Sequence, residues 1–507
     1  MSDERGKVDD RGALERSSAA EAEAPLAGLV VVEEEALTDA EGTIRSGKLA
    51  GKSLPAAIVI LAAPILLQQV AAACLGLVDK IIAGRLPEEV VVPALDGLGI
   101  GSYIGWFIGI AMAGLGVGGQ AIIARAIGGG RGSEAHHALG QTMSLSFLWG
   151  ALIGAALWRA APIVADLCKL TPEATEMCID YVRILAYSMP FCGIMMVGSM
   201  CLCGAGETTK PAVIAVLVNI VNIIFSWALA GADLPIGPLR PPFEMHVVGI
   251  ALGTALSYIV GAMLILSVQR RGVKDLRLET RQLPLKRAMV GRIVRVGVPS
   301  FLDGISMWAA NLFVLVFIGM IAMKSEEGAG LQGAHIIAVQ WEMFSILPGF
   351  AVGIAAGALA AQYLGAGNSA MAQRAILACA GITCLIMGSV GVVYVSAGGP
   401  LTRIISGEQV HLDHVPNLLF ICGLTQVFFA ITMVMRQGLR GVGDTTWTFI
   451  LTTVSSYGVR LPAAWFFGIF LDRGIEGIWI GLCGEMVVRA ALFSSRFFHG
   501  GWKRIRV

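Results

Sequence analysis

The stretch Gly204-Ala-Gly-Glu-Thr-Thr209 returns later in the chain as Gly441-Val-Gly-Asp-Thr-Thr446, 237 positions further on. A second pair of stretches keeps the same spacing. It consists of Gly116-Val-Gly-Gly-Gln-Ala-Ile-Ile-Ala-Arg-Ala-Ile-Gly128 and Gly353-Ile-Ala-Ala-Gly-Ala-Leu-Ala-Ala-Gln-Tyr-Leu-Gly365. A constant offset between separated matches is typical of an internal repeat. The sequence therefore predicts two similar halves that arose by duplication.

Around these motifs the chain consists of long apolar runs separated by short polar breaks. Of its 507 residues, 56% are hydrophobic and 14% are charged, about half the charged share of an average globular protein. A soluble fold of this composition would expose large apolar patches, so an ordinary soluble enzyme is excluded. The net charge of +1, without a basic domain, gives no indication of nucleic acid as a partner.

Twelve of the apolar runs are long enough to cross a bilayer as helices, which takes about 20 residues each. The runs lack the alternation of apolar and polar residues that a membrane β-barrel needs. We therefore expect an all-α integral membrane protein with twelve transmembrane helices. The expected spans are 57–83, 97–124, 140–165, 179–203, 211–231, 247–268, 295–322, 335–361, 375–397, 414–438, 446–470 and 474–494.

Each repeat contains six of these spans, so both halves enter the membrane in the same orientation. This arrangement predicts two six-helix bundles, residues 55–269 and 295–495, related by a pseudo-two-fold axis along the membrane normal. Secondary transporters built from such repeats place the substrate between the halves and move one half against the other.

The segments outside the two bundles differ in charge. Residues 1–54 carry 12 acidic and 7 basic residues and predict a disordered acidic tail. The linker 270–294 and the tail 496–507 are rich in Lys and Arg. Basic segments remain on the cytoplasmic side of a membrane. We expect a multi-pass plasma-membrane protein with both termini in the cytoplasm.

Motifs throughout the chain resemble the multidrug and toxic compound extrusion (MATE) transporters. They are Pro64-Ile-Leu-Leu-Gln-Gln69, Gly76-Leu-Val-Asp79, Gly204-Ala-Gly-Glu-Thr-Thr-Lys-Pro211, Glu342-Met-Phe-Ser-Ile-Leu-Pro348 and Gly438-Leu-Arg-Gly-Val-Gly-Asp-Thr-Thr446. The resemblance implies secondary active efflux: small organic, often cationic, compounds leave in exchange for protons or sodium by alternating access. It implies no enzyme activity and no cofactor beyond the coupling ion. A related activity, a flippase for a lipid-linked precursor, is the alternative.

Asp79 is the leading candidate for the ion-coupling site of the first half. A carboxylate inside a membrane span costs about 3 kcal/mol or more, and such residues mark ion pathways by default. Asn222 and Ser226 lie one helical turn apart on one face, and Thr254 of the next span is expected to face them. The alternatives for Asp79 are a pairing with Lys80 or Arg85 and a cap of the helix at the membrane interface. The alternative for Asn222 is a purely structural hydrogen bond between spans.

Ser226 and the second half depart from the patterns of the family. One family branch has an Asp where this chain has Ser226, and another has a Glu on helix 7 where counting from Pro299 gives Met307. Glu342, which matches a Glu of many relatives, and Asp303, one turn before Met307, are the remaining carboxylates that we expect to attract cationic substrate or take a proton. The expected substrate cavity comprises Glu342, Asp303, Met307, Trp308 and Gln69.

Other polar groups favour simpler interpretations. Glu485 and Arg489 are four residues apart and predict an internal ion pair. No sequence pattern indicates a metal site. The expected partners are the lipid bilayer and small organic substrates, with a monomer as the expected oligomeric state.

Overall fold

The computed structural model describes residues 53–167, 172–232, 243–273, 276–323 and 328–505, and within these ranges the chain is almost entirely helical. The first half contains α2 (Leu54–Ala83), α3 (Glu88–Gly128), α4 (Gly132–Leu167), α5 (Pro172–Gly204), α6 (Thr209–Ala230) and α7 (His246–Arg271). The second half contains α8 (Arg287–Ala322), α9 (Gly328–Gly365), α10 (Ser369–Ile405), α11 (Gln409–Gly441), α12 (Thr445–Ser455), α13 (Leu461–Trp465) and α14 (Gly474–His499).

The prediction of an all-α membrane protein is confirmed. Eleven helices of the described residues are long and apolar enough to cross a membrane. The remaining expected span, 446–470, is also helical, but it is divided among α12, α13 and two π-helical segments, Ser456–Arg460 and Phe466–Phe470. Large apolar side chains remain exposed on the outer helices, for example Leu385 and Val392 on α10. Hydrocarbon accommodates such a surface, whereas water does not.

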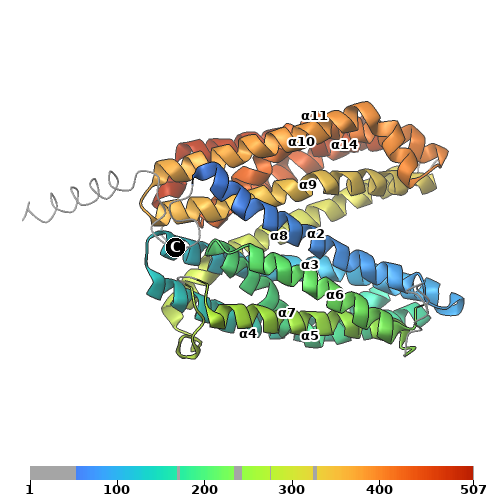
Figure 1. Cartoon of the computed structure of the whole chain (residues 1–507). Helices are drawn as coiled ribbons and strands as arrows, with labels where there is room; N and C mark the ends of the chain where they lie inside the picture. Colours follow the sequence, from blue (N-terminus) through green and yellow to red (C-terminus); the bar gives the residue numbers. More distant parts are fainter. Residues whose placement is uncertain (1–52, 168–171, 233–242, 274–275, 324–327, 506–507) are drawn as a thin grey trace, which may run out of the picture.

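The helices form two bundles that follow the two halves of the chain. In Figure 1 the bundles converge at the end that holds the C-terminus and diverge toward the opposite end. Helix α2 belongs to both bundles. Its first turns, with Ile58 and Leu61, share a buried cluster with Leu359 of α9, whereas Asn219 of α6 donates a hydrogen bond to the carbonyl oxygen of Ala71 (2.9 Å).

Equivalent residues of the repeat join the two halves at the convergent end. Arg125 on α3 donates a hydrogen bond to the carbonyl oxygen of Val442 (2.8 Å), and Gln362 on α9 donates one to that of Gly204 (2.7 Å). Arg125 and Gln362 are 237 positions apart, so each half caps the Gly-rich turn of the other. The motifs that indicate the duplication thus also form the contact between its products.

Backbones approach closely at the same place, which explains two of the repeated glycines. A Cβ atom on Gly128 would lie 1.9 Å from the carbonyl oxygen of Gln362, and one on Gly365 would lie 2.1 Å from that of Arg125. Any larger residue would push the two helices apart.

The linker is shorter than the expected segment 270–294, because α7 extends to Arg271 and α8 begins at Arg287. Gln141 on α4 holds the linker by accepting a hydrogen bond from the backbone N–H of Lys286 (2.6 Å). At the other end, α14 and a short 3-10 turn, Gly501–Arg504, occupy most of the expected tail 496–507. The expected acidic tail lies outside the described residues, apart from its last two positions.

Candidate functional site

Asp79 lies in the next-to-last turn of α2 and is buried, with 4% of its surface exposed. The amide of Asn222 on α6 donates a hydrogen bond to Asp79 Oδ1 (3.1 Å), and the hydroxyl of Thr254 on α7 donates one to Oδ2 (2.9 Å). The hydroxyl of Tyr181 on α5 lies close enough to Asp79 to interact with it electrostatically. Four helices therefore meet at one carboxylate.

The hydrogen bonds to the Asp79 carboxylate come from uncharged side chains. In the described part of the chain, no Lys or Arg forms an ion pair with this carboxylate, so the alternative pairing with Lys80 or Arg85 is not observed. A buried carboxylate of this kind depends on its hydrogen bonds for stability. It is also free to change its charge without breaking a salt bridge.

The predicted companions of Asp79 form one network around it. Asn222 Nδ2 lies 3.2 Å from Ser226 Oγ and 3.0 Å from Thr254 Oγ1. It thus has three acceptors for two hydrogens. Thr254 has a second acceptor, the carbonyl oxygen of Ile250 (3.1 Å). Asn222 Oδ1 is buried and accepts no hydrogen bond from any described residue. The network has spare partners and can rearrange.

Close packing of α6 on α7 places these side chains. Asn222 and Ser226 share one face of α6, and Gly253 of α7 lies directly against Ser226. A Cβ atom on Gly253 would lie 2.2 Å from Ser226 Oγ. This glycine lets the helices approach until the neighbouring Thr254 reaches both Asn222 and Asp79.

The two carboxylates expected to line a substrate cavity have different surroundings in the structure. Asp303 on α8 is fully buried and paired with Arg436 on α11, so it is not the unpaired cation-attracting group that the sequence predicts. Glu342 on α9 is half-buried, and Arg460 lies close enough to interact with it electrostatically. Met307, Trp308 and Gln69 are half-buried, and within the described residues none of them forms a hydrogen bond with either carboxylate.

The expected ion pair between Glu485 and Arg489 is confirmed, with Nε and Oε1 2.6 Å apart. Arg460 adds a second cation at 3.3 Å from Glu485 Oε2. Arg489 also donates hydrogen bonds to the hydroxyls of Ser455 (2.8 Å) and Ser456 (2.7 Å). The second half thus contains a buried network of charges, unlike the neutral surroundings of Asp79.

A comparison with protein families decides where this helical duplication belongs. The model of the MatE family matches residues 64–228 and 299–466, one stretch in each half and together more than half of the chain. The chain belongs to the MatE family.

Two curated relatives of this MatE protein are multidrug resistance proteins by name. "Probable multidrug resistance protein NorM" of Thermotoga maritima is 27% identical over 448 residues, covering 88% of this chain and 93% of the relative. "Multidrug resistance protein PmpM" of Pseudomonas aeruginosa is 25% identical over 463 residues, covering 89% and 92%.

Solved structures show the same fold. A MOP superfamily transporter from Pyrococcus furiosus Vc1 matches with a TM-score of 0.79 at 23% identity, covering 90% of this chain and 98% of the other. A second match is described as the outward-facing conformation of a multidrug resistance MATE family transporter. Its TM-score is 0.77 at 22% identity, with coverage of 92% and 100%. The match to the MatE family, the named relatives and the apolar helices together show a multi-pass membrane protein of a transporter family.

Two residues of these sites lie outside the sequence-based predictions. Tyr181 is one polar residue of a long mixed segment, and nothing in the sequence indicates which carboxylate it contacts. Arg436 had a clearer signal. It lies within the expected span 414–438, and an arginine at membrane depth requires a buried partner.

Proposed function

We propose that this MatE protein exports small organic compounds across the plasma membrane in exchange for an ion, and that Asp79 is the coupling carboxylate. The observation that carries the proposal is a buried carboxylate surrounded by neutral donors. The names of the curated relatives support multidrug export as the transport activity. Both termini are proposed to be cytoplasmic, because the basic linker and tail lie at the convergent end.

The proton is the proposed coupling ion. Asn222 and Thr254 already donate hydrogen bonds to Asp79, and a sodium ion would have to displace those donors. A proton on Asp79 needs only an acceptor. The unpartnered Oδ1 of Asn222 supplies one after a rotation of the amide, and the spare acceptors of the network allow that rotation.

Helix α2 connects this chemistry to the arrangement of the halves. Asp79 lies in the first half, whereas the first turns of the same helix pack on α9 of the second half. A change in the contacts of Asp79 with α5, α6 and α7 therefore acts on a helix held by both bundles. An ion that binds more tightly to one arrangement of those contacts shifts the protein molecules toward the conformation with that arrangement.

The test is export of ethidium by cells that produce the wild type, Asp79→Asn or Asp413→Asn. Asp413 is exposed, and its replacement provides the matched control. The proton and sodium gradients are collapsed separately. We expect export by the wild type and the control, loss of at least tenfold in Asp79→Asn, and dependence on the proton gradient alone.

Two results would overturn parts of the proposal. Dependence on the sodium gradient alone would replace the proton as the coupling ion and leave Asp79 in its role. Unchanged export in Asp79→Asn would remove Asp79 from coupling and make Glu342 the next residue to replace.

A further inference from the structure

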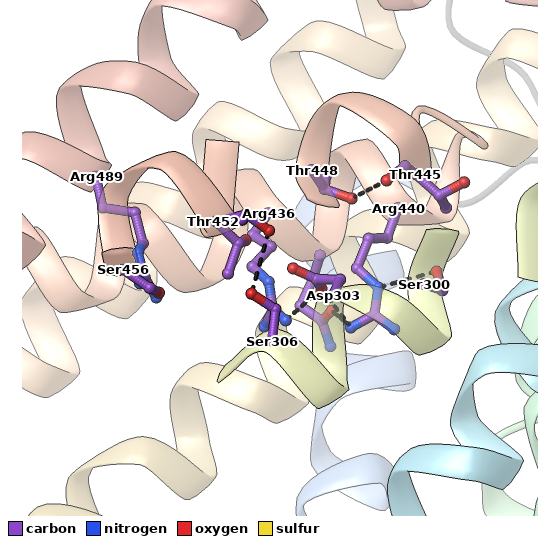
Figure 2. Close-up of polar contacts among 12 residues, drawn as sticks. Ser300, Asp303, Ser306, Arg436, Arg440, Thr445, Thr448, Thr452, Ser456 and Arg489 are labelled. Carbon is purple, nitrogen blue, oxygen red and sulfur yellow. Dashed lines mark hydrogen bonds and ion pairs between the residues drawn. The ribbon is translucent and has the colours of Figure 1, made fainter. Parts of the chain in front are cut away.

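Buried polar side chains gather between α8, α11 and α12 of the second half, away from Asp79. Figure 2 shows Asp303 of α8 facing Arg436 and Arg440 of α11, with hydroxyl side chains of α8 and α12 around them. We call Asp303, Arg436 and Arg440 the arginine cluster. The surrounding hydroxyl residues include Ser300, Ser306, Thr445 and Thr452.

Both arginines of the cluster turn toward one carboxylate oxygen. Arg436 Nη2 pairs with Asp303 Oδ2, and Arg440 Nη1 lies 3.8 Å from the same atom. Arg440 Nε donates a weak hydrogen bond to Ser300 Oγ (3.4 Å). Asp303 is fully buried, whereas each arginine side chain keeps 11% of its surface accessible. One carboxylate thus serves two guanidinium groups.

Several polar atoms of the cluster and its surroundings lack a hydrogen-bond partner among the described residues. They are Arg436 Nε, Asp303 Oδ1, Thr445 Oγ1 and Thr452 Oγ1, all of them buried. Buried polar atoms of native proteins are almost always hydrogen-bonded. Arg436 Nε and the two hydroxyls can donate, whereas Asp303 Oδ1 can only accept, so donors exceed acceptors and the group that would complete this site is an acceptor.

The charges of the second half also lack balance. Arg460 and Arg489 share Glu485, as Arg436 and Arg440 share Asp303. Glu342 lies near Arg460 and is a third carboxylate of this region. The four buried or half-buried arginines therefore still exceed the three carboxylates by one. An uncompensated charge at membrane depth is costly. An anion in the arginine cluster would neutralise the excess.

We propose that the arginine cluster binds the carboxylate of a transported organic compound. Arg436 and Arg440 offer forked donors that match the two oxygens of a carboxylate, and Thr445 and Thr452 offer further hydroxyl donors. The inference rests on the proposed export function and specifies its substrates: anionic and zwitterionic compounds, in addition to cations. The first half then holds an acidic ion-binding site, and the second half holds a basic substrate-binding site.

The test compares two dyes that differ at one group. Rhodamine 110 has a free carboxylate, and rhodamine 123 is its methyl ester. Binding of each dye to the purified full-length protein in nanodiscs is measured by fluorescence anisotropy without any ion gradient. We expect the wild type to bind rhodamine 110 at least tenfold more tightly than rhodamine 123.

Variants of Arg436 identify the group that recognises the carboxylate. Arg436→Gln is expected to weaken binding of rhodamine 110 at least tenfold and to leave rhodamine 123 unchanged, whereas Arg436→Lys retains part of the preference. Arg374→Gln, a replacement of an exposed arginine on α10, is the control. If Arg436→Gln does not fold, the double variant Asp303→Asn/Arg436→Gln removes both charges of the ion pair and serves in its place.

Three outcomes would overturn the inference. They are equal binding of the two dyes by the wild type, an equal loss of both dyes in the Arg436 variants, and tighter binding of farnesyl diphosphate than of rhodamine 110. The last result would assign the cluster to a lipid diphosphate. Failure of the proposed export function is distinguishable, because the binding assay uses no ion gradient: a wild type that exports no ethidium would contradict the export proposal and leave the preference for rhodamine 110 as a separate result.

Discussion

At the scale of single residues, the buried carboxylates of the two halves have different surroundings. Asp79 is surrounded by neutral donors on α5, α6 and α7, whereas Asp303 and Glu485 are each held by two arginines. A carboxylate held by arginines is expensive to neutralise, because its loss leaves a buried cation behind. A carboxylate held by hydroxyl and amide groups has no such constraint. This difference makes Asp79 the better candidate for reversible ion binding.

Tyr181→Phe tests the contact between Tyr181 and Asp79, which the sequence does not indicate. A hydroxyl that can donate a hydrogen bond to a charged group contributes about 1.5–3 kcal/mol. We therefore expect the export rate of ethidium to fall roughly tenfold, with unchanged amounts of protein in the membrane. Tyr187→Phe on the same helix is the control, since Tyr187 is exposed and its hydroxyl accepts a hydrogen bond from Trp158, away from Asp79. Equal export by the two variants would remove Tyr181 from the site.

Glu485→Gln tests the ion network of α14. The change leaves Arg460 and Arg489 without their shared counter-charge, and removal of one partner of a buried pair costs about 3–5 kcal/mol. We expect a clear decrease in the thermal unfolding temperature, measured with a thiol-reactive dye that reports exposure of the buried cysteines. The exposed Glu408→Gln is the matched control. A decrease no larger than that of the control would contradict this account.

At the scale of helices, close packing depends on glycine where two elements exchange backbone contacts. Gly253 brings α7 onto α6 within the first half and so completes the Asp79 network. Gly128 and Gly365 instead bring α3 and α9 together across the two halves. The same residue type thus builds a site in one place and joins two bundles in the other.

Gly365→Ala is expected to weaken the convergent end. The new Cβ atom would overlap the backbone oxygen of Arg125, which no side-chain rotation relieves. Spin labels at Ser133 and Ala370, equivalent exposed positions of the two halves, measure the separation by electron–electron double resonance. We expect a longer and broader distance distribution than in the unmodified chain.

Gly109→Ala provides the control for this distance measurement. Gly109 is also on a helix of the first half, α3, but an added Cβ atom would meet no other atom within 4 Å. The distribution should therefore stay unchanged. If Gly365→Ala also left it unchanged, the contact between Gly365 and Arg125 would not hold the two halves together.

At the scale of the whole molecule, the bundles are joined by reciprocal contacts rather than by the linker alone. The contacts of Arg125 and Gln362 are related by the repeat, and Arg292 of α8 adds an ion pair to Glu134 of α4 (2.7 Å). Helix α2 packs on both bundles. These interactions connect the halves independently of chain continuity.

Division of the chain in the linker tests this independence. Co-expressed fragments 1–274 and 275–507 are expected to copurify through a tag on one fragment and to export ethidium at a rate within about threefold of the intact protein. Combining the split with Arg125→Ala and Gln362→Ala should reduce copurification, because each hydrogen bond contributes about 1 kcal/mol. Fragments that never copurify would show that the linker is essential for assembly.

Much of the fold can be read from local properties of the chain. Membrane helices are recognised from long runs of neighbouring apolar residues. The two equivalent halves are recognised from motifs that repeat at an offset of 237 residues. The expected span 446–470 is helical, but its division by π-helical segments is not indicated by the sequence. The group around Asp79 is also predictable in part, since Asn222 and Ser226 share a helical face and Thr254 lies in the next span.

Sequence alone thus determined the membrane class, the duplication and a candidate carboxylate, Asp79, in the first half. Only the tertiary structure decided that Tyr181 joins this carboxylate, that Arg436 pairs with Asp303, and that the bundles converge where the repeated glycines meet. Asp303 and Arg436 are 133 positions apart, and charges in separate helices are paired by packing, not by spacing along the chain. The chemistry of each half therefore depends on which helix faces lie against each other.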